Sequence, residues 1–410
     1  MTDTSTIKSD IVIVGGGIAG LAMAARLATH TTFTITVLDG DHAPKMPDDA
    51  LQLRTTSLNS AALNLLKEAG VMAHLPARFL TDFNRLEAGS RDAPDALSFS
   101  AEDINLPRFG VFVENDRLRA ALWQTLTTMA QVTLISEARL SSLQRHDDHV
   151  DGLLDDGRAL DIRLVIGADG ARSHVRHLAG ISSQQRDYAQ EAMIINVRLT
   201  ESPGHTTWQI FTPDGPVALL PLHDRQASLI WYDRPGQIQK RMSMSDDTLR
   251  AAIIEAFPTR LGQIEAIIER GRFPIRRLHA QRYVGKRVAL IGDAAHVIHP
   301  MAGQGINLGL ADVVSLAEAL EHESDPGNDQ ALSRYQRRQW PRNAAMLTGV
   351  EQLHHLFTLP FAPLRTLAER GLRGADRMGP VKRFMMSLAT GQPLTTGKGS
   401  TDHDASSRQR

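Results

Sequence analysis

One stretch of the chain combines a carboxylate with several glycines. Residues 292–307 read GDAAHVIHPMAGQGIN and directly follow an apolar run at residues 288–291. Such a run is typical of a buried strand, and open α/β sheets bind ligands at the carboxyl ends of their strands. We therefore expect Asp293 to face a crevice, and Gly303 and Gly305 to let the backbone approach a ligand closely. Because a helical pattern follows, with free N–H groups at its start, the stretch predicts a site for a polyhydroxylated, anionic cofactor.

A second glycine-rich segment, near the N-terminus, carries the pattern G-x-G-x-x-G. It follows a β-branched run at residues 10–14, and its glycines are Gly15, Gly17 and Gly20. In dinucleotide-binding units the first glycine makes the tight turn, the second admits the pyrophosphate and the third lets helix and strand pack closely. Asp39, at the end of the next expected strand, is placed to accept hydrogen bonds from an adenosine ribose. This order of strand, loop, helix, strand and acid predicts nucleotide binding, whereas a glycine-rich turn with no nucleotide is the plain alternative.

Composition excludes several classes of protein. The chain has 410 residues, 42% of them hydrophobic and 22% charged, which favours two domains or one large α/β unit. A net charge of −1 gives no global attraction to nucleic acid. The absence of cysteine excludes disulfides and thiolate metal sites. Since the first residues are polar and show no secretory signal, we expect a cytoplasmic protein.

The expected elements alternate between two patterns along the chain. Helical spacing over residues 114–127 and strands at 132–135 and 164–168 continue the nucleotide-binding pattern. Alternating β-type runs fill residues 192–232, and a helical pattern follows over residues 246–271. Two β–α segments therefore flank a β-rich insertion, which is the candidate for a substrate domain.

Three motifs together resemble the fingerprints of the FAD-dependent aromatic hydroxylases, the single-component flavoprotein monooxygenases. The first is the G-x-G-x-x-G segment. The second is Asp169-Gly170-Ala171-x-Ser173-x-x-Arg176, and the third runs from Gly292-Asp293 through His299-Pro300 to Gly303-Gln304-Gly305-x-Asn307. They occur in the order found in the family, and the similarity spans roughly residues 8–390. Segments at residues 113–123, 220–231 and 379–382 further resemble the ubiquinone-biosynthesis hydroxylases.

The resemblance implies an α/β fold in which a Rossmann-like FAD-binding domain is interrupted by a β-rich substrate domain and followed by a C-terminal helical region. The expected FAD-binding domain is discontinuous and comprises residues 1–75, 106–185 and 280–345. The expected substrate domain comprises residues 76–105 and 186–279. The helical region would comprise residues 346–392 and a disordered tail residues 393–410.

The resemblance also assigns roles to single residues. The implied cofactor-binding residues are Gly15, Gly17, Gly20, Asp39, Arg54, Asp169, Gly170, Asp293, Pro300, Gly303, Gly305 and Asn307. Asp293 would bind the ribityl hydroxyls of FAD, and the Arg54 guanidinium suits a phosphate or a flavin oxygen. Arg172 and Arg176 are candidate partners for the phosphates of NAD(P)H. Arg119 falls near a position that contacts flavin in the family.

The reaction implied by the family needs FAD, NAD(P)H as a transient co-substrate, and O2. The reduced flavin forms a C4a-hydroperoxide, which hydroxylates an electron-rich aromatic ring in a site that excludes water. The subfamily resemblance implies a polyprenylated phenol or quinol of ubiquinone biosynthesis as the substrate. A flavin monooxygenase acting on a soluble small aromatic and a non-catalytic flavoprotein subunit of a biosynthetic complex remain as alternatives.

No catalytic acid or base and no metal site is expected from the sequence. His296 and His299 lie close together, but a metal site needs three or four ligands, and no third ligand has a convincing spacing to these histidines. We expect structural roles beside the cofactor for both.

The C-terminal region is locally basic. Between His354 and Met386 the positive residues are Arg365, Arg370, Arg373, Arg377, Lys382 and Arg383, and the negative ones are Glu369 and Asp376. Leucines and phenylalanines lie between these charges, so the segment at residues 350–386 suits either peripheral contact with the inner face of a membrane or a helix packed on the flavin domain with a solvated basic face. Partners in a biosynthetic complex are a further expectation.

Overall fold

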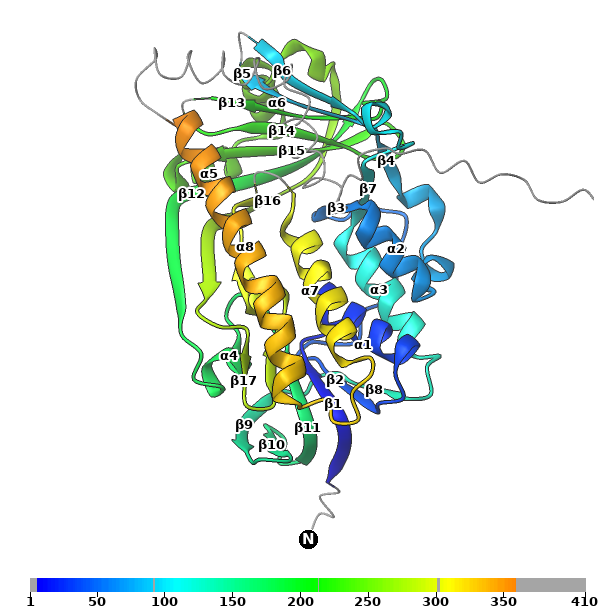
Figure 1. Cartoon of the computed structure of the whole chain (residues 1–410). Coiled ribbons are helices and arrows are strands. Elements are labelled where there is room, and N and C mark those ends of the chain that lie inside the picture. Colours follow the sequence, from blue (N-terminus) through cyan, green and yellow to red (C-terminus); the bar gives the residue numbers. More distant parts are fainter. Residues whose placement is uncertain (1–5, 91–92, 213, 301–302, 359–410) are drawn as a thin grey trace, which may run out of the picture.

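A sheet built around parallel strands forms the lower half of the molecule in Figure 1. The computed structural model describes residues 6–90, 93–212, 214–300 and 303–358. The strand order of this sheet is β17-β18-β11-β1-β2-β8. Its strands are β1 (Ile7–Val14), β2 (Ile35–Leu38), β8 (Val132–Ile135), β11 (Ala159–Gly167), β17 (Val284–Gly285) and β18 (Val288–Leu290), with the hairpin of β9 (Leu140–Arg145) and β10 (Val150–Leu154) added to β11. Ile11, Val12 and Ile13 of the central strand are fully buried, as expected for a strand covered on both faces.

Helices pack on this sheet and on one another. They are α1 (Ile18–His30), α2 (Ser60–Glu68), α3 (Asn115–Leu126), α4 (His174–Leu178) and α7 (Gly305–Leu320). Helix α1 lies against both α3 and α7. The strand predicted at residues 132–135 and the helix predicted at residues 114–127 are confirmed as β8 and α3.

A second sheet forms the upper half, with the strand order β19-β16-β12-β15-β14-β13-β5-β6. Its strands are β5 (Arg85–Ser90), β6 (Ala93–Ser100), β12 (Ser183–Leu199), β13 (Thr206–Phe211), β14 (Val217–Pro221), β15 (Gln226–Asp233), β16 (Ile264–Ala280) and β19 (His296–Val297). Side chains alternate between the two faces of a strand. One face, with Met193, Ile195 and Trp231, packs beneath α5 (Pro235–Met242) and α6 (Asp246–Ala256).

The helical pattern predicted over residues 246–271 is wrong in its second half. Helix α6 ends at Ala256, and β16 begins at Ile264. The backbone of β16 pairs with β12 from Ser183↔Ala280 to Leu199↔Ile264. Cross-strand hydrogen bonds formed with a distant segment therefore override the local pattern, which is a tertiary effect that residues 264–271 do not reveal by themselves.

A small antiparallel sheet joins the two halves, in the order β3-β7-β4. Its strands are β3 (Thr55–Asn59), β4 (Thr81–Phe83) and β7 (Gly110–Glu114). Short 3-10 turns complete the connections: η1 (Val71–His74), η2 (Ala77–Phe79), η3 (Ala101–Ile104), η4 (Thr259–Leu261) and η5 (Gly292–Ala294).

The long helix α8 (Asp329–Thr358) runs from the lower sheet to the upper one (Figure 1). It covers the first part of the helical region predicted at residues 346–392; the remainder of that region and the tail at 393–410 lie outside the described residues. Among the helices that the structure describes, none has the length and hydropathy needed to cross a membrane.

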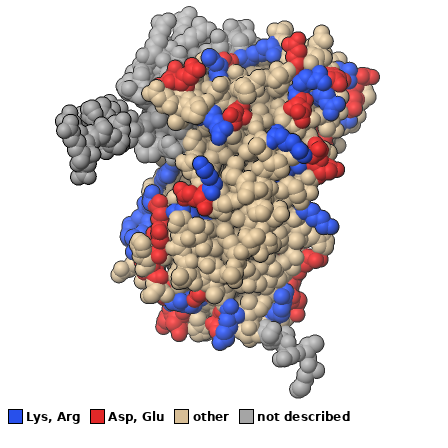
Figure 2. Space-filling view, turned by 90° about the vertical axis from the view of Figure 1, so that its right-hand side faces the viewer, with Lys and Arg blue, Asp and Glu red and all other residues tan. Residues whose placement is uncertain are grey.

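Charges of both signs are interspersed on the side of the molecule shown in Figure 2, which is the right-hand side of Figure 1. A broad uncharged area occupies much of the lower half of this face. The mixed distribution agrees with the net charge of −1.

Candidate functional site

Four neighbouring parallel strands of the lower sheet terminate side by side, so their carboxyl ends lie at the same end of the sheet. Backbone hydrogen bonds tie them together: Gly15 N donates to Leu38 O (2.8 Å), Ala168 N to Val14 O (2.8 Å) and Ile291 N to Gly167 O (3.0 Å). Each of the three sequence motifs begins at the end of one of these strands. Segments that are far apart in the sequence therefore form a single crevice.

The glycine turn after β1 leaves no room for side chains at two of its three predicted positions. Gly15 has φ +117°, and a Cβ there would lie 2.3 Å from Ala168 O. A Cβ on Gly20 would lie 2.0 Å from Gly15 O, so α1 sits directly on the turn. Gly17, by contrast, has no protein atom within 4 Å of its Cβ position. The space before the N-terminus of α1 is thus left open at the glycine expected to admit the pyrophosphate.

Gly16, which sequence reasoning did not single out, is just as constrained. A Cβ on it would lie 2.1 Å from Asp39 Oδ2. Asp39 follows β2 and is buried. Its carboxylate forms an ion pair with Arg119 of α3, and Arg119 Nε donates to Gly16 O (2.7 Å). Arg119 therefore joins the glycine turn to the acid, and its predicted contact with flavin stays a prediction.

The second motif mostly organises protein structure. Asp169 Oδ2 accepts from His174 N (2.7 Å) and Val175 N (3.0 Å), which caps α4. Its other oxygen is buried and has no hydrogen-bond partner among the described residues. Arg176 is buried and donates to Ala294 O (2.7 Å) and Ala171 O (2.9 Å). Burial lowers the pKa of Arg176, an effect that the charge of Asp169 opposes.

These contacts change the interpretation of the two arginines in the second motif. Arg176 fastens the second motif to the third, and its side chain faces protein carbonyls rather than solvent. Arg172 is exposed, and its contact with a nucleotide phosphate stays a prediction. Gly170, with φ +78°, makes the turn between β11 and α4.

Asp293 lies in η5, directly after β18. Its side chain is accessible to solvent, but protein atoms surround it on most sides. This burial raises the pKa of the Asp293 carboxyl, and the charges of His296 and Arg54 oppose the increase. Arg54 is exposed and thus contributes a positive charge to the same crevice. A close approach positions the turn: a Cβ on Gly309 of α7 would lie 3.2 Å from Gly292 Cα.

A buried acid that sequence reasoning missed holds this turn from behind. Asp312 of α7 is fully buried and accepts from Gly292 N (3.0 Å) and Asn343 Nδ2 (2.9 Å). His296 Nε2 lies 2.6 Å from Asp312 Oδ2. Burial disfavours the imidazolium, but Asp312 outweighs it and keeps the pKa of His296 above its usual value. The prediction of a structural position beside the cofactor motif fits His296.

Asn307 connects the third motif to β3. Its Oδ1 accepts from Asn59 N (3.0 Å) and its Nδ2 donates to Ser57 O (2.9 Å). Ser57 Oγ in turn donates to Gly303 O (3.1 Å), and Gly303 has φ +59°. Helix α7 begins at Gly305, two residues after Gly303. Asn307 itself is engaged by backbone groups.

The loop that carries Arg54 is held by a buried pair in α3 and β7. Glu114 and Arg117 form an ion pair with side chains that are 2% and 1% exposed. Glu114 Oε1 accepts from Gln52 N (2.6 Å), and Arg117 donates to Pro47 O (3.1 Å) and Ala50 O (3.0 Å). The Val113-Glu114-Asn115 segment thus orients the cofactor-side loop.

Comparison with known proteins agrees with this arrangement. The FAD binding domain family matches residues 8–350. Over 388 residues the chain is 41% identical to the 3-demethoxyubiquinol 3-hydroxylase of Escherichia coli K12, an alignment that covers 93% of this chain and 98% of that one. The chain is a member of the FAD-dependent hydroxylases.

Two further proteins are similar to this chain. The ubiquinone hydroxylase UbiL of Rhodospirillum rubrum is 33% identical, covering 95% of this chain and 91% of the relative. The crystal structure of p-nitrophenol 4-monooxygenase PnpA from Pseudomonas putida DLL-E4 superposes on this chain with a TM-score of 0.79 at 17% identity. The superposition covers 95% of this chain and 100% of PnpA. The superposition on PnpA supports the fold. The prediction of an α/β flavoprotein monooxygenase with FAD as its cofactor is confirmed.

The crevice of the hydroxylase has the features that FAD requires. Gly17 leaves open space at a helix N-terminus, where backbone N–H groups favour an anion. Asp39 still has lone pairs for hydroxyl donors beside its bond to Arg119. Asp293 offers a carboxylate for further hydroxyls at the opposite side of the same end of the sheet. The residues present therefore fit the pyrophosphate and the hydroxyl groups of FAD.

The upper sheet of the hydroxylase turns an apolar, aromatic face toward this end of the lower sheet. Ala192, Ile194, Ala218, Ile230, Tyr232 and Ile275 form one buried cluster, against which Leu53 and Tyr188 pack. His299, next to Pro300, has its ring centroid 5.1 Å from that of Tyr188 and 5.7 Å from that of Tyr232. The sheet face therefore meets the cofactor loop directly at His299.

Proposed function

We propose that the protein hydroxylates the ring of a polyprenylated phenol or quinol in ubiquinone biosynthesis, with NAD(P)H as reductant and O2 as oxidant. The observation that carries the proposal is the extent of the similarity to 3-demethoxyubiquinol 3-hydroxylase, which covers 93% of this chain and therefore includes the upper sheet as well as the FAD motifs. A substrate face shared along its whole length favours a shared class of substrate.

We assign FAD binding to the residues predicted from the sequence: Gly15, Gly17, Gly20, Asp39, Arg54, Asp169, Gly170, Asp293, Pro300, Gly303, Gly305 and Asn307. The open space at Gly17 and the carboxylates of Asp39 and Asp293 support the assignment. Bound FAD supplies the oxygen-activating chemistry. The protein's task is to bind the ring close to the flavin and to exclude water, for which the buried face around Tyr232 is suited.

The cofactor and the substrate would be bound by different predicted domains. We propose that residues 1–75, 106–185 and 280–345 bind the cofactor, and that residues 76–105 and 186–279 bind the substrate. The position of β5, β6 and β12 to β16 in one sheet supports the second group.

Quinone profiling of a strain that lacks the gene tests the proposed substrate. We expect a prenylated intermediate that lacks one ring hydroxyl to accumulate, and mass spectrometry would identify both the intermediate and the ring position. An unchanged quinone pool would contradict the proposal and favour a soluble small aromatic as substrate. Purified protein provides the direct comparison, since NAD(P)H oxidation coupled to product formation should respond to a prenylated phenol and not to the unprenylated ring.

We further propose that the protein is cytoplasmic and lies on the inner face of the membrane through residues 350–386, where it would meet its substrate and other enzymes of the pathway. The excess of positive charge in this segment supports the proposal, since each Lys or Arg near an anionic surface contributes about 1 kcal/mol. Sedimentation with anionic vesicles should remove the full-length protein from solution, but not a chain ending at residue 358. Equal sedimentation of both chains would contradict it.

A further inference from the structure

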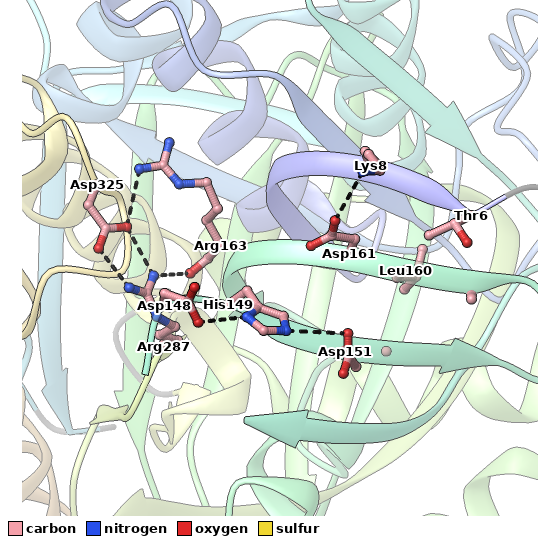
Figure 3. A pocket seen from close by; sticks show the side chains of 12 residues that line it. Thr6, Lys8, Asp148, His149, Asp151, Leu160, Asp161, Arg163, Arg287 and Asp325 are labelled. Atoms are coloured by element: carbon pink, nitrogen blue, oxygen red, sulfur yellow. Dashed lines mark hydrogen bonds and ion pairs between the residues drawn. The ribbon is translucent and has the colours of Figure 1, made fainter. Parts of the chain in front are cut away.

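A hollow of about 860 Å³ lies at the amino ends of strands β1 and β11, at the opposite end of the lower sheet from the cofactor crevice. It is lined by the first residues of β1 and β11 and by the β9–β10 hairpin (Figure 3). Because β1 and β11 run parallel and a strand rises by about 3.3 Å per residue, this end is roughly 25 Å from the glycine turn. Whatever binds here is remote from the flavin.

The cationic groups of the hollow already have partners. Lys8 Nζ lies 3.6 Å from Asp161 Oδ2, and Arg287 Nη2 lies 2.7 Å from Asp325 Oδ2. Arg163 also reaches Asp325, at 3.5 Å (Figure 3). The imidazole of His149 and the carboxylate of Asp151 also line the hollow, and His146 lies beside them.

His146, His149 and Asp151 bring one ligand atom each to within 4.8 Å of one another. His146 Nε2 lies 3.0 Å from Asp151 Oδ2, and His149 Nε2 lies 3.7 Å from Asp151 Oδ1. The two imidazole rings are stacked, with centroids 4.4 Å apart. One nitrogen of each ring therefore faces a different oxygen of the Asp151 carboxylate, beside the turn of the hairpin.

A neighbouring carboxylate fixes the orientation of one imidazole. His149 Nδ1 lies 2.7 Å from Asp148 Oδ1 (Figure 3). A hydrogen bond from Nδ1 to a carboxylate leaves the lone pair on Nε2, which is the arrangement that metal-binding histidines use in proteins. The turn itself is anchored, because Arg287 Nε donates to Asp147 O (2.8 Å). The cluster is thus held in place by groups that are not ligands.

We propose that His146, His149 and Asp151 form a binding site for one divalent cation of the zinc class. Two imidazoles and one carboxylate suit Zn²⁺, whereas Mg²⁺ and Ca²⁺ prefer oxygen ligands. Bonds of about 2.0 Å to tetrahedral zinc place neighbouring ligand atoms about 3.3 Å apart; the 3.0 Å between His146 Nε2 and Asp151 Oδ2 is close to this value, and all three ligand atoms lie within 4.8 Å of one another. The cation would brace the β9–β10 hairpin and keep a fourth position open to solvent.

Titration of the full-length, tag-free flavoprotein with Zn²⁺ tests the proposal. After removal of metals with a chelator, calorimetry should show one site per chain, and the His149→Gln and Asp151→Asn variants should bind Zn²⁺ at least tenfold more weakly. His42→Gln is the matched control, since His42 is an exposed histidine that pairs with Glu137 outside the cluster. It should bind Zn²⁺ like the parent protein.

A second measurement separates a specific site from loss of folding. Zn²⁺ should raise the melting temperature of the parent and of His42→Gln, but not that of His149→Gln, while all of these proteins retain their flavin. Mg²⁺ should have no such effect. Zinc binding that is equal in parent and cluster variants, or absent from the parent, would overturn the proposal.

Discussion

Three consecutive glycines, Gly15 to Gly17, share one loop but have different neighbours. The carbonyl of Ala168 fills the space beside Gly15, and Asp39 fills the space beside Gly16, whereas Gly17 faces open space. The first two glycines are therefore required by the protein itself. We expect the third to be required by the cofactor that binds there.

Alanine substitutions should separate these two requirements. Gly16→Ala places a methyl group 2.1 Å from Asp39 Oδ2, so we expect it to lower the stability of the flavin-free protein and to abolish FAD binding. Gly17→Ala should leave that stability within about 0.5 kcal/mol of the parent but weaken FAD binding at least tenfold. Denaturant unfolding and fluorescence titration with FAD measure the two effects. Equal loss of stability in both variants would contradict this account.

Arg119 is expected to act through charge. It pairs with Asp39 beside the space left by Gly17, and without it the carboxylate would repel the pyrophosphate. We expect Arg119→Met to raise the Kd for FAD about tenfold, which corresponds to about 1.4 kcal/mol, and Arg119→Lys to restore part of the loss. A Kd for Arg119→Met equal to that of the parent would show that Asp39 is neutralised in another way.

At the scale of elements, the cofactor loops depend on buried side chains of the neighbouring helices α3 and α7. Helix α7 supplies Asp312 to the turn at Gly292, and α3 supplies Arg117 to the loop before Arg54. Both side chains are fully or almost fully buried. A buried charge that loses its partner is costly, so these elements are locked to one another.

Breaking the Glu114–Arg117 pair should reveal this coupling. Arg117→Met leaves Glu114 buried without its partner, and we expect it to cost about 3–5 kcal/mol in the free energy of unfolding. Arg78→Met is the control in the same region, because the Arg78–Asp49 pair is exposed and should contribute less than about 1 kcal/mol. Chemical denaturation of both variants gives the comparison, and similar losses would argue against the coupling.

The interface between β16 and α8 should make stability depend on pH. Burial lowers the pKa of His279 from 6.5 to about 4, and the charges of His296 and Arg277 act in the same direction. Between pH 6.5 and 4, His279 is therefore protonated in the unfolded chain but not in the folded protein. The free energy of unfolding should fall by up to about 3 kcal/mol as the pH drops from about 6.5 to about 4. His279→Gln should reduce this slope of unfolding free energy against pH. An unchanged slope would exclude His279 as its source.

At the scale of the whole molecule, α8 links the two sheets. Glu351 near its end lies 2.6 Å from Arg186 Nη1 of β12 and 3.5 Å from Arg277 Nη1 of β16. The same helix packs on α7 beside the cofactor turn. The position of the upper sheet relative to α7 and the cofactor turn therefore depends in part on this helix.

Glu351→Gln should weaken that link. The Glu351 side chain is only 13% exposed and serves two arginines, so we expect its neutralisation to cost about 1–3 kcal/mol. Glu318→Gln is the matched control on α7, because its pair with Arg338 is exposed and should contribute less than about 1 kcal/mol. Thermal unfolding measures both, and equal melting temperatures for the two variants would show that the link is not significant.

Much of the cofactor side was predictable because its signals are local. The turn glycines, the acid after β2 and the Gly-Asp after β18 all follow short apolar runs that form strands of the core. Arg119, Asp312 and Gly16 were less visible, since each owes its position to a residue on another element. Arg176 was placed in the motif correctly, but its contacts with two carbonyls could not be read from its spacing.

The sequence by itself determined the α/β class and a nucleotide-binding site, because periodicity, glycine positions and strand-end acids act over a few residues, and the resemblance of its three motifs to a known family implied FAD. Only the tertiary structure decided that residues 264–271 form a strand, that Asp312 holds the Gly292 turn, and that a sheet face with Tyr232 meets the loop at His299. These features arise from pairing and packing between distant segments. Their free energy depends on which surfaces meet, and local sequence does not specify that.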